Sequence, residues 1–203
     1  MLLLTFTSKT MSNTNNQTEG FIPPHGGYRN LITYQKAEII YDGTVYFTTR
    51  FFNKYDRTVS QMVQAARSGK QNIAEASIVS GTSKESEIKL TNVARASLEE
   101  LLIDYEDFLR THKLSVWNRS HRLIKRIQEL NKSVPKPTYE TFKNAIEHQS
   151  PEICANTMII LIKITTWLLD RQLRSLEDAF LYEGGMRERM AKVRTGIRKK
   201  RNS

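Results

Sequence analysis

The chain has little cysteine, glycine or proline, and each shortage excludes a class of protein. Its 203 residues include one cysteine, Cys154, with 9 glycines and 5 prolines. A single cysteine excludes a disulfide framework and a zinc site built on several thiolates, and it is typical of the reducing cytoplasm. So few glycines and prolines disfavour an all-β fold, which needs many turns. We therefore expect a cytoplasmic protein.

Long hydrophobic runs are also missing. The most apolar stretch, residues 158–169, contains Lys163 and is shorter than the roughly 20 residues that span a bilayer. Residues 1–4 are apolar, but no basic residue precedes them and the run ends before Ser8, which is too short for a signal peptide. Met11 opens a polar stretch typical of an ordinary protein start, which leaves open whether residues 1–10 are native. The sequence predicts no membrane span and no membrane partner.

Motifs for catalysis, cofactors and metals are absent from the sequence. It contains no phosphate-binding loop, no Gly-x-Ser-x-Gly and no His-Glu-x-x-His. A di-iron bundle needs Glu-x-x-His pairs. No histidine of the chain has a Glu three positions before it. The residues at that position are Ile22 for His25, Leu109 for His112, Asn118 for His121 and Ala145 for His148. Cys154 is interpreted as a small core residue rather than a nucleophile. We expect a non-enzymatic protein without cofactor or metal.

One segment of the chain is rich in acidic residues. It contains Glu99, Glu100, Asp104, Glu106 and Asp107. Metal binding or catalysis is one interpretation of such a cluster. The interpretation that we favour is a solvated helix face, or a contact for the basic side of a neighbouring subunit.

Positive charge is what the chain has in excess. It holds 31 Lys and Arg against 21 Asp and Glu, which gives a net charge of +10 and a pI near 9.7. Residues 186–203 hold eight Lys and Arg with one Glu, so they supply +7 and the remaining residues +3. This balance predicts a polyanionic partner, with RNA or DNA first and an anionic membrane second.

Apolar residues recur at helical spacing along most of the chain. The pattern predicts helices over residues 30–52, 57–79, 82–110, 116–131, 138–148 and 151–183. Asp56 is the expected N-cap of the second helix, and Thr82 with Glu85 is the expected capping box of the third. Gly184 and Gly185 are expected to end the last helix.

Four of these helices are long and amphipathic, which predicts an all-α antiparallel four-helix bundle over residues 29–185. A helical insert, residues 112–149, falls between the third and fourth long helices. Residues 1–28 are polar and contain Pro23-Pro24 and Gly26-Gly27, so they predict a disordered lead-in. Residues 186–203 form a basic C-terminal tail.

The insert contains a basic segment, residues 116–131. On a helical wheel, one arc holds Val116, Trp117, Leu123, Ile124, Ile127 and Leu130. The opposite arc holds Arg119, Arg122, Lys125 and Arg126, and Glu129 is the one acid in the segment. Cations spaced in this way suit phosphate oxygens. A plain solvated face is the alternative, and the pattern leaves both open.

The tail has its own helical pattern. Met186, Met190, Val193 and Ile197 recur at helical spacing, so the tail is able to form an amphipathic basic helix on a surface. Its candidate phosphate contacts are Arg187, Arg189, Lys192, Arg194, Arg198, Lys199, Lys200 and Arg201. A disordered solubilising tail and a membrane-surface helix are the alternatives, and the lack of Trp and Phe disfavours the second.

Three motifs resemble a known family. Residues 72–76 read Asn-Ile-Ala-Glu-Ala, residues 83–85 read Ser-Lys-Glu, and residues 94–101 read Ala-Arg-Ala-Ser-Leu-Glu-Glu-Leu. This set resembles the bacterial four-helix-bundle family of the 23S rRNA intervening-sequence protein, which includes the accessory variability determinant of diversity-generating retroelements. The resemblance covers residues 30–111 and 151–183. Ala76 and Ala96 stand where that family has glycine, and Ser86 or Glu87 stands where an aromatic residue is usual.

The resemblance implies a non-enzymatic bundle, commonly a pentameric ring with a basic surface. In retroelements such a ring binds a reverse transcriptase and its RNA. The insert and tail would make this chain one of the longer variants. Together with the charge, this predicts a homo-oligomeric accessory or scaffold protein that binds RNA or DNA through phosphates, with a reverse transcriptase as an expected partner. The alternative function is a protein–protein adaptor whose basic tail docks on an acidic partner.

Overall fold

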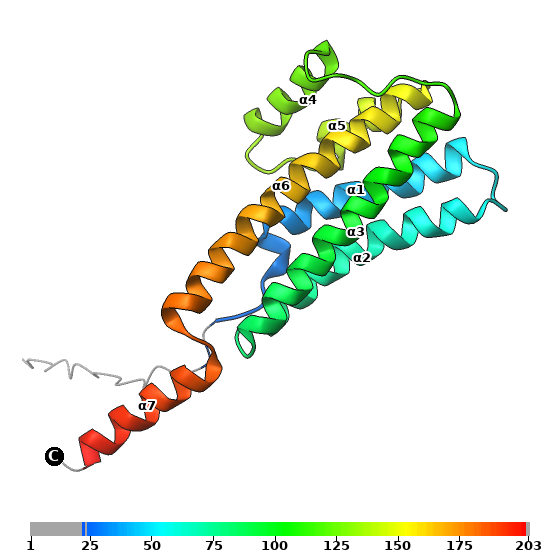
Figure 1. The fold of residues 1–203 in the computed structure, drawn as a ribbon. Coiled ribbons are helices and arrows are strands. Elements are labelled where there is room, and N and C mark those ends of the chain that lie inside the picture. The colour runs from blue at the N-terminus through cyan, green and yellow to red at the C-terminus, as the bar shows by residue number, and fades with distance from the viewer. Residues whose placement is uncertain (1–21, 23, 202–203) are drawn as a thin grey trace, which may run out of the picture.

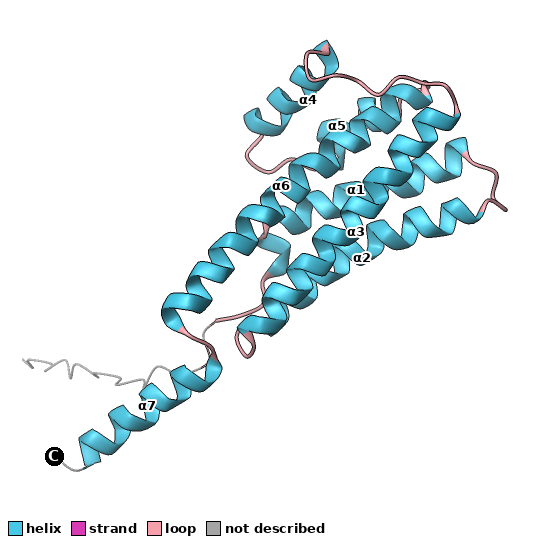
Figure 2. Cartoon of the chain, in the orientation of Figure 1, coloured by secondary structure: helices cyan, strands magenta, loops and turns pink. Residues whose placement is uncertain are grey.

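A computed structural model describes residue 22 and residues 24–201, and these residues form helices and no strand (Figure 1, Figure 2). In chain order they are η1 (Tyr28–Asn30), α1 (Ile32–Phe51), α2 (Arg57–Val79), α3 (Lys84–Thr111), α4 (Arg122–Ser133), α5 (Tyr139–Ile146), α6 (Pro151–Glu183) and α7 (Met186–Arg201). The predicted all-α class is therefore confirmed. Most of the predicted lead-in, residues 1–21 and 23, lies outside the described residues.

The four long helices contact one another in a closed order. α1 packs on α2, α2 on α3, α3 on α6, and α6 on α1. We call this group the helical core. α4 and α5 lie beside the first half of α6, and α7 leaves from the opposite end of α6 (Figure 1).

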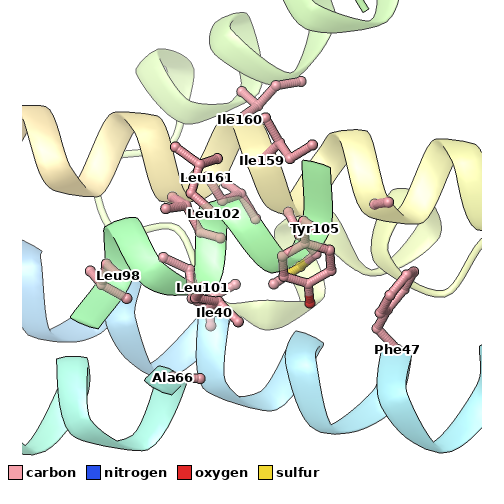
Figure 3. Packing of buried hydrophobic residues seen from close by; sticks show 14 of the residues in the cluster. Ile40, Phe47, Ala66, Leu98, Leu101, Leu102, Tyr105, Ile159, Ile160 and Leu161 are labelled. Carbon is pink, nitrogen blue, oxygen red and sulfur yellow. The ribbon is translucent and has the colours of Figure 1, made fainter. Parts of the chain in front are cut away.

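An aromatic cluster fills one end of the helical core. Phe47 on α1 contacts Tyr105 and Phe108 on α3, with ring centroids 4.9 and 4.8 Å apart. Figure 3 shows Tyr105 between the ribbon of α6, with its labelled residues Ile159, Ile160 and Leu161, and the ribbon of α1. The Tyr105 hydroxyl donates to the Thr44 hydroxyl at 3.1 Å, so no buried polar atom is left unpaired there. Burial raises the pKa of Tyr105 far above its ordinary value, and the phenol stays neutral.

Close helix contacts explain two glycines inside helices. A Cβ on Gly43 of α1 would lie 2.7 Å from Sδ of Met158, and one on Gly69 of α2 would lie 2.7 Å from Cδ2 of Leu98. Both glycines are buried. They are present because a side chain would push the neighbouring helices apart, at the cost of about 1 kcal/mol of helix propensity each.

The helix ends test the predicted caps. The Asp56 carboxylate accepts a hydrogen bond from the Thr58 N–H at 2.9 Å, as predicted. For α3 the cap prediction is wrong by one residue. The Ser83 hydroxyl accepts from the Ser86 N–H at 3.1 Å, whereas the Thr82 hydroxyl donates backward to the Val79 carbonyl. Thr82 therefore belongs to the turn that ends α2.

Cys154 lies in the first turn of α6 and is fully buried. Its thiol donates to the His148 carbonyl at 2.9 Å. Burial raises the pKa of this thiol to about 11, so it remains protonated and unreactive at neutral pH. These properties are those of a core residue.

α6 is the most apolar helix of the chain. A window of 18 residues within Pro151–Arg201 has a mean hydropathy of 1.5, which is enough by length and composition to cross a membrane. However, 67% of that window is buried among the other helices. An apolar helix that is mostly buried in this way is typical of a protein core.

Candidate nucleic-acid interface

The candidate cations form two groups. The insert cations are Arg119, Arg122, Lys125 and Arg126. The α7 cations are Arg187, Arg189, Lys192, Arg194, Arg198, Lys199, Lys200 and Arg201. Each group is positioned by different contacts.

The segment before α4 is fixed on α6 and is not helical, so the predicted helix over 116–131 is wrong at its start. The Asn156 side chain accepts from the Trp117 backbone N–H at 2.8 Å and donates to the Ser115 carbonyl at 2.9 Å. The Trp117 indole N–H donates to the Glu152 carboxylate at 3.1 Å. Because Asn156 and Glu152 of α6 form hydrogen bonds with residues 115–117, these residues are not helical. α4 therefore begins at Arg122, six residues after the predicted start. Val116, which the helical wheel places on the buried arc, is 49% exposed.

His121 starts α4. Its Nδ1 accepts from the Leu123 N–H at 3.4 Å, and its ring stacks on Trp117 with the centroids 4.2 Å apart. A turn closed by Asn118 precedes it, since the His121 N–H donates to the Asn118 carbonyl at 3.0 Å. Arg119 lies in this turn rather than on the helix. The predicted placement of Arg119 on a helix face is therefore wrong, although it stays close in sequence to the cations of α4.

The buried side of α4 rests on the helical core. Ile127 is only 4% exposed, and Ile124 and Leu130 pack partly buried against the core. At the C-terminal half of α4, the Lys36 ammonium of α1 donates to the Asn131 side-chain carbonyl. Lys36 is 4% exposed, and burial lowers its pKa. This lysine, which the sequence analysis does not single out, ties α4 to α1.

The opposite side of α4 carries the cations. Arg122, Lys125 and Arg126 are all exposed, as is Arg119. Among the described residues, no acidic side chain forms an ion pair with any of these four. The predicted division of α4 into a packed face and a basic face is therefore present from Arg122 onward. Charges without local partners are available to an external anion.

A break at Gly184 and Gly185 separates α7 from α6, as predicted. Gly184 has φ 75°, a left-handed conformation that favours glycine, and its N–H donates to the Phe180 carbonyl at 3.0 Å. The Gly185 N–H donates to the Glu188 carboxylate at 2.9 Å, which satisfies the start of α7.

α7 is a basic helix with a narrow apolar stripe, and none of its residues is buried. Met190, Val193 and Ile197 are 38%, 38% and 54% exposed. At 100° per residue, the α7 cations lie on both flanks of this stripe. The sixteen residues of α7 thus form the amphipathic basic helix that the tail sequence predicts.

The two groups lie at opposite ends of the molecule (Figure 1). α4 rests beside the first half of α6, and α7 starts after its last residue. From Ile160, beside α4, to the end of α6 the helix rises about 35 Å at 1.5 Å per residue. The structure gathers the cations within each group and does not bring the two groups together.

Two of the five acids in the cluster on α3 pair with basic neighbours. Glu106 pairs with Lys163 of α6 at 2.9 Å, and Asp107 with Arg110 at 2.7 Å. Burial, together with the charges of Glu100 and Asp107, raises the pKa of Asp104. Within the described residues, no group of three or more His, Cys, Asp or Glu side chains could hold a metal ion.

One residue of the resembling motifs, Ser97, joins α3 to α2 inside the chain, because its hydroxyl lies 2.9 Å from that of Ser68. The Asn72 amide donates to the Ser68 carbonyl at 2.9 Å within α2. Glu75 and Glu100 are exposed.

Comparison of the chain with protein-family models, with characterised proteins and with solved structures finds no match. The family resemblance therefore stays a prediction that rests on these motifs.

Proposed function

We propose that this protein is a non-enzymatic accessory or scaffold protein that binds RNA or DNA through backbone phosphates. The observation that carries the proposal is α7. This helix holds eight Lys and Arg with one Glu, and every one of its residues from Met190 to Arg201 is exposed. A helix of this kind can follow a phosphate backbone and release its counterions, which is the main source of sequence-independent affinity.

The insert cations support the same function from the other end of the molecule. They have no acidic partner among the described residues, and three of them project from the exposed face of α4. A nucleic acid long enough to follow the molecule for about 35 Å would contact both groups. A shorter one would contact α7 alone.

The proposed architecture is an antiparallel four-helix bundle made of α1, α2, α3 and α6, with α4 and α5 as its insert. The closed order of contacts among these helices supports it. The motif resemblance then suggests a pentamer and a reverse transcriptase with its RNA as partners.

An adaptor function has one observation in its favour. The stripe of Met190, Val193 and Ile197 is apolar and exposed, and binding to phosphates does not require it. An acidic protein with an apolar groove would contact both the stripe and its basic flanks.

Salt dependence separates the two functions. Fluorescence anisotropy with a labelled RNA and a labelled DNA duplex is measured between about 50 and 200 mM salt. We expect binding to both ligands, with a steep linear fall of log affinity against log salt. Lys192→Gln with Lys200→Gln should reduce that slope by about 1 to 2. The matched control, Lys54→Gln with Lys89→Gln, removes the same charge from exposed sites elsewhere and should leave the slope unchanged. No binding at the lowest salt would overturn the proposal.

A further inference from the structure

The C-terminal end of α6 carries apolar side chains that the helical core covers only in part or not at all. The last buried residue of α6 is Leu169, fourteen positions before the helix ends at Glu183. Beyond it, Leu173, Leu176 and Phe180 face the same side of the helix and are only half-buried. Leu181 is 78% exposed and Tyr182 is 87% exposed. We call residues 170–183 the open end of α6.

The open end exists because α1 begins too late to cover it. α1 runs antiparallel to α6, with the Thr33 hydroxyl donating to the Gln172 side chain at 3.3 Å. Thr33 is the second residue of α1. Residues of α6 after Gln172 therefore extend past the start of α1, and the last turns of α6 project beyond that helix (Figure 1).

α7 does not fill this space in its own chain. After the break at Gly184 and Gly185, α7 runs onward and away from the helical core (Figure 1). Its stripe of Met190, Val193 and Ile197 consequently remains exposed. One chain thus has two unpartnered apolar faces that belong to consecutive helices and do not pack on each other.

The two faces match in length and in charge. The sixteen residues of α7 extend about 24 Å, and the open end of α6 about 20 Å, at 1.5 Å per residue. The open end of α6, residues 170–183, contains four acidic residues, Asp170, Glu177, Asp178 and Glu183, against Arg171 and Arg174, while α7 carries eight Lys and Arg with one Glu. Glu177 and Asp178 are exposed. An apolar stripe flanked by cations fits an apolar face edged by acids.

We infer that α7 docks on the open end of α6 in a second copy of this chain. The stripe of α7 covers Leu173, Leu176 and Phe180 of the other copy, and the α7 cations approach its acidic residues. If the exchange is reciprocal, two such contacts form and the buried area doubles, toward the roughly 1,200 Å² of a specific interface. A head-to-tail exchange would instead close into a ring.

Sedimentation velocity at micromolar concentration measures the number of copies. We expect the full chain to exceed the 23.5 kDa of one copy. The triple variant Met190→Ser, Val193→Ser, Ile197→Ser should sediment as a single copy with unchanged far-UV circular dichroism. A matched control, Val45→Ser, Ile103→Ser, Val116→Ser, changes residues that are 38%, 58% and 49% exposed on other surfaces and should keep the mass of the parent. A single-copy mass for the full chain, or an unchanged mass for the stripe variant, would overturn the inference.

Cross-linking tests which surfaces meet. Chains with Glu177→Cys, an exposed position beside Leu173 and Phe180 on the helix, and chains with Val193→Cys are purified separately, mixed and mildly oxidised. We expect a disulfide between the two kinds of chain, and much less of it when Tyr55→Cys, 80% exposed at the far end of the core, replaces Glu177→Cys. Equal yields would overturn the inference.

The docking and the proposed function can fail separately. The stripe variant keeps every α7 cation, so it should still bind nucleic acid with the same salt slope per chain. If the stripe variant fails to assemble but still binds nucleic acid, the result supports both the docking and the proposed function. If the full chain assembles but binds no nucleic acid, the result supports the docking alone and overturns the proposed function.

Discussion

The insert cations and the α7 cations differ in how the rest of the chain holds them. Trp117 fixes the start of the insert on α6 by two hydrogen bonds, and Lys36 ties α4 to α1 through Asn131. α7 has no buried residue and follows a glycine break. The insert cations are therefore presented in a fixed arrangement. The α7 cations lie on an exposed helix, and we call the segment that contains it, residues 186–203, the arm. Fixed groups bind with little loss of conformational entropy, whereas an arm adapts to more shapes at a greater entropic cost.

This comparison predicts that the arm supplies most of the affinity. Deleting residues 186–203 removes +7 of the net +10. At moderate salt, affinity for RNA or duplex DNA should fall at least tenfold, and the log–log slope should become shallower by about 0.9 for each lost contact on duplex DNA. At protein concentrations too low for copies to associate, the chemical denaturation midpoint should stay the same, because α7 has no buried residue within its own chain. Unchanged affinity and slope would show that the arm is not the contact and would favour the adaptor.

The distance between the two groups predicts a dependence on ligand length for the insert. The variant Arg119→Ala, Arg122→Ala, Arg126→Ala should weaken a duplex of about 24 base pairs by about fivefold, because such a duplex spans both groups at 3.4 Å per base pair. A duplex of about 8 base pairs is shorter than the separation and should bind the variant as it binds the parent. An equal loss on both duplexes would contradict the separation of the groups.

Local signals predict the fold well, and long-range contacts limit the prediction of the site. α2 starts where Asp56 caps it and ends where predicted, since cap and helix lie side by side in sequence. The start of α4 is wrong because Asn156, 39 positions from Trp117, decides the backbone there. Helical periodicity contains no trace of such a partner.

The contact of Lys36 with α4 is also a long-range contact that local sequence does not predict. Lys36 adjoins the buried Ala37, but a lysine is ordinarily exposed, and nothing local identifies Asn131 as its partner. The separation of the two cation groups depends on the length of α6, which the sequence does predict. It also depends on α4 lying beside the first half of α6, which the sequence does not.

The fixed end of the molecule can be tested through Lys36. Burial lowers its pKa, so the folded state binds fewer protons than the unfolded state between that lowered pKa and about 10.5. The lysine therefore stabilises the fold less at lower pH, and this penalty is relieved as pH rises toward 10.5. Lys36→Met removes the dependence and costs about 1 kcal/mol or less, since a lost hydrogen bond is offset by removal of a buried charge.

The measurement is the difference in unfolding free energy between the parent and Lys36→Met, from denaturant curves between pH 7 and about 10.5. Burial raises the pKa of Tyr105 and of Tyr139, which destabilises both proteins at high pH and cancels in the difference. We expect the parent to gain on the variant as pH rises. A constant difference would mean that Lys36 is solvated and does not fix α4.

The smallest expected effect concerns the entropic cost of the arm. Gly196 lies inside α7, and a Cβ there would meet no atom within 4 Å. Gly196→Ala therefore adds no clash and favours the helix by about 0.5 to 1 kcal/mol. If ordering of the arm opposes binding, part of this gain should appear as an affinity about twofold tighter, with an unchanged salt slope because no charge changes. Anisotropy titrations of parent and variant side by side resolve such a factor. Weaker binding by the alanine variant would mean that the bound arm is not helical at Gly196, and the contrast between a fixed insert and an adaptable helix would then need a different bound form of the arm.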